Sequence, residues 1–409
     1  APVPLNDDGG KQLHAEQTII NTQMIEYSNR YSVPLLLASD AHYLNAEDYL
    51  PHQVWLCIQS NDKMSDPKRF QFSCDHLHVR SATEIQSDYR QWYGQLPHSA
   101  IVNTVELLKR SGVNISHFHN YVPKFPLDGK LSSWDYLCQV VKGQWDMFLR
   151  NGKINVYLQQ HPGVTLESAK QLYKDRLIHE LRQIHTLGFV DYFLIVWDLI
   201  NWCDKNGIVR GPGRGSSAGS LVCYLLGITK ADPMLYVLIF ERFIAPDRVT
   251  SPDIDMDFSS SQRTQVIQYL QNRWGQDNVV RVGTNIYSKG KLVLRDIGRV
   301  YEIPDSAISQ VSSLVIQRST GDARASMTLA DTFAEFTSAK TFDAQYPHIK
   351  PIATRLEGVI RHRGKHASGI VITPGPSVDI VPLERPDEYG LFTSSLDYHQ
   401  CDELGLLKL

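Results

Sequence analysis

Three aspartates alternate with apolar residues in the segment VTSPDIDMDFSS, residues 249–260. If this segment is extended, the spacing places Asp253, Asp255 and Asp257 on one face and the apolar side chains on the other. Like charges held so close repel one another, and divalent cations would remove the repulsion. Carboxylates suit Mg²⁺, and a pair of such ions can stabilise the attacking and leaving oxygens of a phosphoryl transfer. The alternative is a solvated edge strand whose charges oppose aggregation.

A glycine-rich segment, GPGRGSSAGSLVCYLLG, lies upstream at residues 211–227. Its glycines let the backbone approach a ligand, and its serines and Arg214 can bind phosphate. The apolar run from Leu221 predicts a helix whose N-terminal N–H groups would face an anion. Neither a P-loop nor a GxGxxG pattern is present, and the alternative is a tight turn before a buried helix. A phosphate-binding loop followed by an Asp-x-Asp strand is typical of a nucleotidyltransferase.

Helices and strands must position these two segments. Thr165 is a plausible N-cap for a helix that ends at Gly188, and an apolar helix over residues 191–207 ends at Gly207. The run VPLLLAS, residues 33–39, predicts a buried strand of an α/β unit. Residues 292–362 read as mostly helical.

Composition indicates a soluble chain of two or three domains, with 409 residues, 42% of them hydrophobic and 21% charged. No apolar run reaches the length of a membrane span. Six cysteines form no CxxC pair, so a reducing cytoplasm is expected. The net charge is −3, yet residues 205–300 carry 13 Lys and Arg against 8 Asp and Glu. A basic surround with an acidic focus suits a polyanion held near metal ions.

Residues 211–259, GPGRGSSAGSLVCYLLGITKADPMLYVLIFERFIAPDRVTSPDIDMDFS, resemble the palm of the bacterial C-family DNA polymerases, the DNA polymerase III alpha subunits. The likeness continues through LRDIGRVYEIP, LEGVIRHRGKHASGIVITPGP and the final DELGLLKL, and upstream through PLLLASDAHYLNAEDYLPHQVWLCIQ. It implies an α/β and α+β multidomain fold. Residues 1–120 would be the C-terminal part of a PHP (β/α) domain. A polymerase-beta-like nucleotidyltransferase palm would occupy residues 121–290 and 363–409, with a helical thumb inserted at 291–362.

The resemblance also implies site residues. Asp253 and Asp255 match the first two aspartates of the family's PDxDxDF motif, which carry two catalytic Mg²⁺ ions. The third position is not always acidic among relatives, so Asp257 is expected to be supportive. Nucleotide-binding positions of the family match Arg214, Gly215, Ser216, Arg242 and Lys408.

The sequence departs from the family pattern at both ends. Relatives continue after GLLKL with Asp-Phe-Leu-Gly, so the third catalytic carboxylate would be residue 410. The HxH metal motif of the PHP domain would precede residue 1. We therefore expect an internal fragment that binds metal weakly and polymerises poorly by itself.

A second metal site is expected at Asp40 and His42, because the D-x-H in SDAHY matches the last metal motif of PHP domains, which bind Zn²⁺, Mn²⁺ or Mg²⁺. The alternative is a loop aspartate beside a structural histidine. Two HxH patterns, His76–His78 and His117–His119, match no ligands of the family. Lys365 and His366 are given no role beyond a backbone or DNA contact.

The implied function is template-directed DNA synthesis from dNTP on primer-template DNA. In the intact protein the implied partners are a sliding clamp, a clamp loader and a proofreading subunit, and no membrane is expected. One alternative is a metal-dependent phosphoesterase or 3′–5′ exonuclease centred on Asp40 and His42. Another is a non-catalytic DNA-binding fragment.

Overall fold

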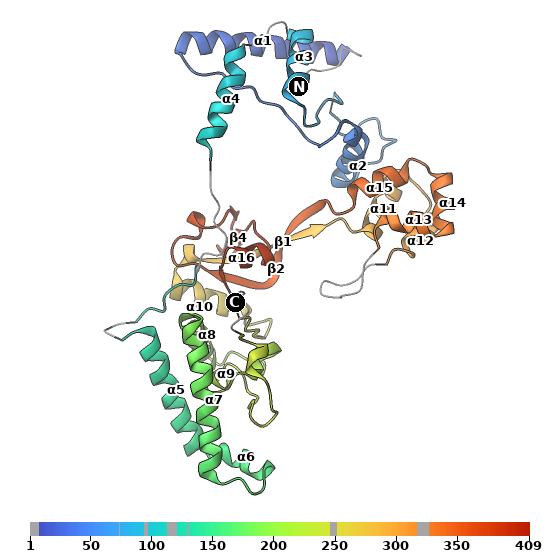
Figure 1. Ribbon diagram of the computed structural model, residues 1–409. Helices are drawn as coiled ribbons and strands as arrows, with labels where there is room; N and C mark the ends of the chain where they lie inside the picture. Colours follow the sequence, from blue (N-terminus) through green and yellow to red (C-terminus); the bar gives the residue numbers. More distant parts are fainter. Residues whose placement is uncertain are drawn as a thin grey trace. The chain divides into compact units, whose positions relative to one another are not determined.

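The computed structural model describes residues 8–72, 74–93, 97–112, 121–127, 129, 131–245, 252–316 and 327–409. The chain forms two compact units, each built from two segments of the sequence (Figure 1). The first unit contains Ala1–Asn114 and Ile286–His362, and the second contains Ile115–Asn285 and Arg363–Leu409. Helices and a small mixed sheet agree with the expected α/β multidomain class. The identities of the segments as PHP domain, palm and thumb stay predictions.

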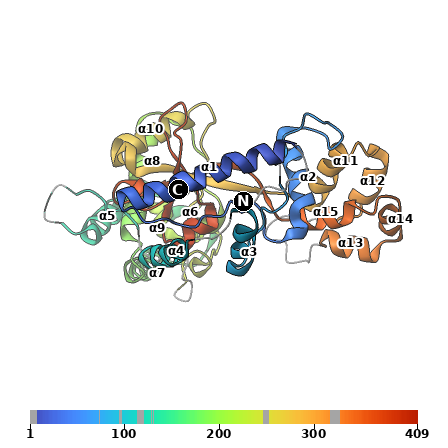
Figure 2. The same ribbon diagram turned by 90° about the horizontal axis from the view of Figure 1, so that it is seen from above.

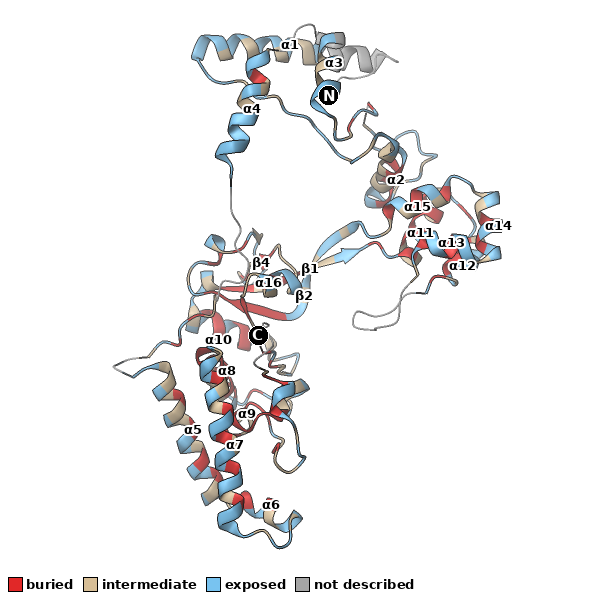
Figure 3. Ribbon diagram, in the orientation of Figure 1, coloured by how far each residue is buried: buried red, intermediate tan, exposed pale blue. Residues whose placement is uncertain are grey.

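The second unit has a helical half built around α8, Val190–Lys205. Every residue of α8 from Val190 to Val196 is buried, which Figure 3 shows as a red band on this helix. The other helices of this half are α5 (Ser133–Arg150), α6 (Ile154–Gln160), α7 (Leu166–Thr186), α9 (Leu221–Leu225) and α10 (Arg263–Trp274). The predicted N-cap is confirmed, since the Thr165 side chain accepts the N–H of Ser168 at 3.2 Å. Among the described residues no single helix is long and apolar enough to cross a membrane, whereas α7 and α8 together, bent by 113°, meet that test of length and composition.

The sheet has the order β3-β4-β1-β2-β5. Strand β4 is parallel to β1 and antiparallel to β3, and β5 is antiparallel to β2, where Lys408 lies opposite Val371. Helix α16 (Tyr398–Glu403) leads into β5. The strands are β1 (Val279–Tyr287), β2 (Ile360–Ile372), β3 (Leu383–Glu384), β4 (Thr393–Ser394) and β5 (Leu407–Lys408). This order places the last residues of the chain beside β2.

The first unit has a helical core that confirms the helical pattern expected over residues 292–362. Helix α2, Tyr49–Ser60, packs against α11 and α15, and the three lie together in both views (Figures 1 and 2). The core helices after α2 are α11 (Gly290–Val300), α12 (Asp305–Ser312), α13 (Leu329–Glu335), α14 (Thr337–Gln345) and α15 (Ile349–Leu356). The remaining helices are α1 (Asp8–Tyr31), α3 (Ala82–Tyr93) and α4 (His98–Arg110).

The predicted buried strand at residues 33–39 is wrong. These residues, all of them within the described part of the chain, form no strand, and Val33 is 59% exposed. The segment is instead tied to α4, because Thr104 Oγ1 accepts the N–H of Leu37 at 3.0 Å and Asn103 donates to the carbonyl of Leu35. An apolar run becomes a buried strand only where neighbouring strands pair with it. Side-chain contacts from one helix do not supply that pairing.

Candidate functional site

The aspartate segment and the glycine-rich segment lie side by side in the second unit. Isolated antiparallel bridges join Arg210 to Phe258 and Arg214 to Asp255. The N–H of Gly211 donates to the carbonyl of Asp257 at 2.9 Å. The predicted alternation is confirmed, because Ile254 is buried whereas the three carboxylates are exposed or half-buried. Backbone pairing therefore holds the row of aspartates against the start of the loop.

Arg214 partly neutralises the row of aspartates. Its Nη2 lies 3.6 Å from Asp255 Oδ1 and its Nε lies 3.6 Å from Asp257 Oδ1. These pairs are exposed, so each contributes at most about 1 kcal/mol. The pKa of Asp255 is raised by its partial burial and then by Asp253, while Arg214 opposes the rise. One arginine therefore does not balance the negative charge of this face.

Two glycines of the loop have steric reasons to be glycine. Gly215 has φ of +73°, a left-handed conformation that disfavours side chains, and a Cβ there would lie 3.3 Å from Asp255 Oδ2. A Cβ at Gly219 would lie 2.7 Å from the carbonyl oxygen of Ile239. Glycine thus brings the loop against the aspartates at one end and against residues 239–240 at the other.

The carboxylates of Asp253 and Asp255 fit a divalent cation that shares its coordination with substrate. They are hard oxygen donors on one accessible face, and partial burial, followed by the charge of Asp253, raises the pKa of Asp255. Among the described residues no group of three or more His, Cys, Asp or Glu side chains could hold a metal ion. Mg²⁺ does not need such a cage, because it commonly takes one or two carboxylates and completes its shell with water and phosphate.

Lys408 contacts Tyr398, which in turn contacts Asp253 of the site. Lys408 forms an ion pair with Asp402, and its ammonium lies 3.3 Å from the centroid of the Tyr398 ring. The Tyr398 hydroxyl donates to Asp253 Oδ2 at 3.1 Å. Burial and the charge of Asp253 raise the pKa of Tyr398, so the hydroxyl keeps its proton and can donate. Sequence reasoning missed Tyr398, which no local motif marks.

The other predicted nucleotide-binding residues lie on short 3₁₀ turns. Gly215 and Ser216 belong to η2 (Gly215–Gly219), and Arg214 is its N-cap. Arg242 ends η3 (Phe240–Arg242), which packs against η2. The structure therefore brings Arg214 and Gly215 beside the aspartates, with Ser216 next to them in the chain and Arg242 on the adjoining turn η3.

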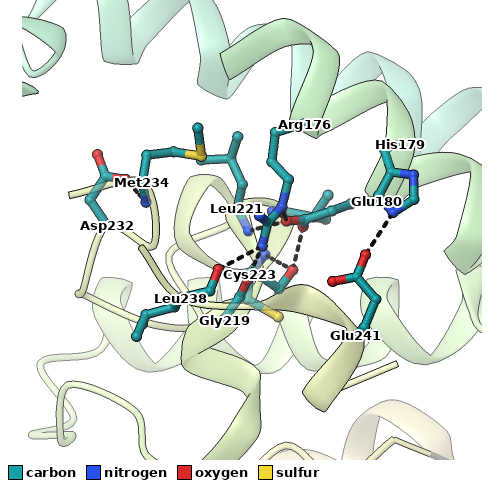
Figure 4. A network of polar contacts seen from close by, with 12 residues as sticks. Arg176, His179, Glu180, Gly219, Leu221, Cys223, Asp232, Met234, Leu238 and Glu241 are labelled. Carbon is teal, nitrogen blue, oxygen red and sulfur yellow. Dashed lines mark hydrogen bonds and ion pairs between the residues drawn. The ribbon is translucent and has the colours of Figure 1, made fainter. Parts of the chain in front are cut away.

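The N-terminus of α9 does not face an external anion, so that prediction is wrong. The carboxylate of Glu180 accepts the N–H groups of Leu221 at 2.9 Å and Val222 at 3.0 Å, and the hydroxyl of Ser220 at 2.8 Å (Figure 4). Glu180 is fully buried on α7, and α9 has only five residues. A side chain of the protein thus occupies the position that a phosphate would need.

Arg176, one turn before Glu180 on α7, ties this carboxylate to the loop. Its Nε donates to Glu180 at 2.6 Å, and its Nη2 donates to the carbonyls of Gly219 at 2.8 Å and Leu238 at 3.0 Å (Figure 4). Burial raises the pKa of Glu180, while the N–H donors and Arg176 oppose the rise. Sequence reasoning missed this pair. The i,i+4 spacing of an arginine and a glutamate, with Glu180 on the apolar stripe of Leu177 and Ile184, was the available signal.

At the expected second metal site, Asp40 and His42 lie beside each other. His42 Nε2 lies 3.1 Å from Asp40 Oδ1, and its ring packs on Phe72 at 4.5 Å. The described neighbourhood adds no third ligand to this pair. In the first HxH pattern His76 pairs with Asp75, and His78 has a buried Nδ1 without a partner among the described residues. His117 and His119 lie outside the described residues.

The part of the chain that holds the site matches a known protein family and curated relatives. The family model described as bacterial DNA polymerase III alpha NTPase domain matches residues 152–409. DNA polymerase III subunit alpha of Thermus aquaticus is 33% identical over 436 residues, which cover 96% of this chain and 35% of that protein. The same subunit of Escherichia coli (strain K12) is 33% identical over 387 residues, 94% of this chain and 32% of that protein. The chain spans about a third of the length of the curated relatives it matches.

Proposed function

We propose, since the chain belongs to the family of the bacterial DNA polymerase III alpha NTPase domain, that it carries the nucleotidyl-transfer site of a replicative DNA polymerase. The reaction is attack of a primer 3′-hydroxyl on the α-phosphate of a deoxynucleoside triphosphate, with pyrophosphate leaving. The observation that supports this proposal best is the pairing of the Asp253–Asp255 segment with the Arg214–Ser216 loop. Carboxylates for metal and donors for phosphate then share one site.

Asp253 and Asp255 would hold two Mg²⁺ ions. When bound there, these ions supply Lewis-acid stabilisation of the attacking oxygen and of the charge that develops on the phosphate. Asp253 is oriented by Tyr398, and Asp255 is fixed by the backbone bridge to Arg214. The protein's contribution is to hold both carboxylates in place before substrate arrives.

Arg214 has two alternating partners in this mechanism. Its guanidinium lies beside Asp255 and Asp257, with nitrogen–oxygen distances of 3.6 Å to each. The side chain is 64% exposed, so it can turn from the carboxylates to a triphosphate at low cost. Ser216 and the backbone of Gly215 would bind the same phosphates, with Arg242 and Lys408 as further cationic contacts. Asp257 would then help to orient Arg214, whose Nε lies 3.6 Å from its Oδ1.

The partners follow from the proposed reaction. Primer-template DNA and dNTP are the substrates, and the exposed basic residues Arg363 and Lys365 on β2 suit the DNA backbone. A sliding clamp, a clamp loader and a proofreading subunit are proposed for the full-length gene product. Zn²⁺ or Mn²⁺ at Asp40 and His42 is proposed only if further ligands join that pair.

The experiment is primer extension by the full-length gene product carrying Asp255→Asn. We expect incorporation to fall by at least about 100-fold, because loss of a ligand should exceed the 10- to 100-fold effect of losing a partner of a ligand. Near-normal synthesis would reject the site. Nuclease activity that survives Asp253→Ala but is lost with His42→Ala would favour the phosphoesterase alternative.

A further inference from the structure

Tyr398 contacts three groups of the second unit, namely the Asp253 carboxylate, the Lys408 ammonium and the His366 ring. Its hydroxyl donates to Asp253 Oδ2 at 3.1 Å, and the Lys408 ammonium lies 3.3 Å from the centroid of its ring. The ring of His366 on β2 stacks on the Tyr398 ring, with centroids 5.9 Å apart and planes inclined by 29°. Tyr398 therefore links the aspartate segment to the paired strands β2 and β5.

The backbone that carries Tyr398 is firmly held. Tyr398 is the first residue of α16, and the N-cap Asp397 accepts the N–H groups of His399 at 3.1 Å and Gln400 at 3.0 Å. Asn285 on β1 also donates to Asp397. Lys408 is anchored in turn by Asp402 and by its place in β5. Because its backbone is held in this way, Tyr398 fixes the position of its hydroxyl. The hydrogen bond then restrains the rotamer of the Asp253 carboxylate.

We propose that Tyr398 is a positioning residue for Asp253, one that occupies Oδ2 and leaves Oδ1 to bind the metal ion. This inference rests on the proposed function, because it takes Asp253 to be a metal ligand. A hydrogen bond to one carboxylate oxygen fixes the rotamer and favours coordination through the other. Partners of metal ligands commonly contribute 10- to 100-fold in metal affinity. Asp255 has a different neighbour, Arg214, whose Nη2 lies 3.6 Å from its Oδ1.

The test is a Mn²⁺ titration of the 409-residue chain followed by electron paramagnetic resonance, with Tyr398→Phe as the variant. Phenylalanine keeps the ring that Lys408 and His366 contact and removes only the hydroxyl. A matched control is Tyr269→Phe, because the Tyr269 hydroxyl donates to Asp198 at 2.5 Å and its ring stacks on Trp202. We expect Tyr398→Phe to weaken Mn²⁺ binding about 10- to 100-fold and Tyr269→Phe to leave it unchanged.

Thermal unfolding of both variants separates positioning from a merely structural role. The proposal requires that Tyr398→Phe changes the Mn²⁺ dissociation constant without lowering the unfolding midpoint more than Tyr269→Phe does. Lys408→Met, which keeps the hydroxyl but removes the cation beneath the ring, should weaken Mn²⁺ binding by less than Tyr398→Phe. Lys408→Met keeps the proposal testable if Tyr398→Phe folds poorly. If Mn²⁺ binding is unchanged in Lys408→Met, then Lys408 does not help to fix the Tyr398 ring, and this counts against the positioning role.

Two results would overturn the proposal and are distinct from each other. If Asp253→Asn abolishes Mn²⁺ binding while Tyr398→Phe binds as the wild type does, the positioning role fails and the proposed metal site stands. If the wild-type chain shows no Mn²⁺ binding that depends on Asp253, the metal site of the proposed function fails, and the role of Tyr398 fails with it.

Discussion

The buried carboxylate of Glu180 accepts the backbone N–H of Leu221 at 2.9 Å and so closes the N-terminus of α9. The glycine-rich loop therefore binds phosphate, in our proposal, with its front residues Arg214 to Ser216 rather than with the helix behind it. Arg176 and Glu180 support the loop from α7 by bonding to its far end. We therefore expect Glu180 and Arg176 to matter for stability, and Arg214 to matter for binding.

Replacing Glu180 with glutamine should destabilise the second unit. The amide cannot accept four hydrogen bonds or neutralise Arg176, which would be left partly buried without its counterion. We expect Glu180→Gln to lower the free energy of unfolding by about 2–4 kcal/mol, measured by denaturant titration. The control is Glu167→Gln on the same helix, where the exposed carboxylate contacts Lys170. Equal stability of the two variants would contradict the assigned role of Glu180.

Gly219 should not tolerate a methyl group. A Cβ there would lie 2.7 Å from the carbonyl oxygen of Ile239, and a backbone atom cannot move aside without shifting η3. Gly219→Ala should cost about 1–3 kcal/mol of unfolding free energy. Gly143→Ala is the matched control, because its Cβ on α5 meets nothing within 4 Å, and it should stabilise by about 0.5–1 kcal/mol. Destabilisation by both substitutions to the same extent would exclude the close-contact explanation.

Asp232 should make stability depend on pH. It is buried, accepts the Tyr173 hydroxyl at 2.9 Å, and has a pKa raised chiefly by burial. Because the folded state then binds the proton more tightly than the unfolded state, this group lowers stability as the pH rises through the folded pKa. Wild type should therefore lose stability relative to Asp232→Asn as the pH rises above 3.8, the ordinary pKa of an aspartate, in denaturant titrations. A gain of wild-type stability relative to Asp232→Asn over the same range would contradict a raised pKa.

Arg214 should compete with metal for the carboxylates. Arg214→Gln removes the cation that lies 3.6 Å from Asp255, so Mn²⁺ binding without nucleotide should tighten by up to about 5-fold. Binding of dNTP should weaken in the same variant, because the proposed contact between Arg214 and phosphate is lost. Arg273→Gln, whose guanidinium pairs with Asp198, should change neither. Weaker Mn²⁺ binding in Arg214→Gln would show that Arg214 supports the metal site instead of competing with it.

Local patterns predicted the elements that carry their own signals. Thr165 marks the start of α7, and the two-residue spacing of Asp253, Asp255 and Asp257 places their side chains away from the core. The glycine-rich loop and the aspartate segment, which the sequence predicts to form one site, are paired in the structure.

Long-range contacts were beyond that reasoning. Tyr398 reaches Asp253 across 145 positions of sequence, and the acidic cap of α9 comes from another helix. The strand predicted at residues 33–39 failed for the same reason, because apolarity alone does not supply neighbouring strands. A short apolar run identifies a candidate strand, which forms only where neighbouring strands pair with it.

Single-nucleotide incorporation by the full-length gene product tests the central claim most directly, with Asp253→Asn, Asp255→Asn and Asp257→Asn compared at saturating Mg²⁺ and dNTP. All three substitutions remove one negative charge from the same face, so they differ only in position. The account predicts a loss of at least about 100-fold for Asp253→Asn and Asp255→Asn, and less than about 10-fold for Asp257→Asn. Equal losses in all three, or normal incorporation with Asp253→Asn or Asp255→Asn, would contradict it.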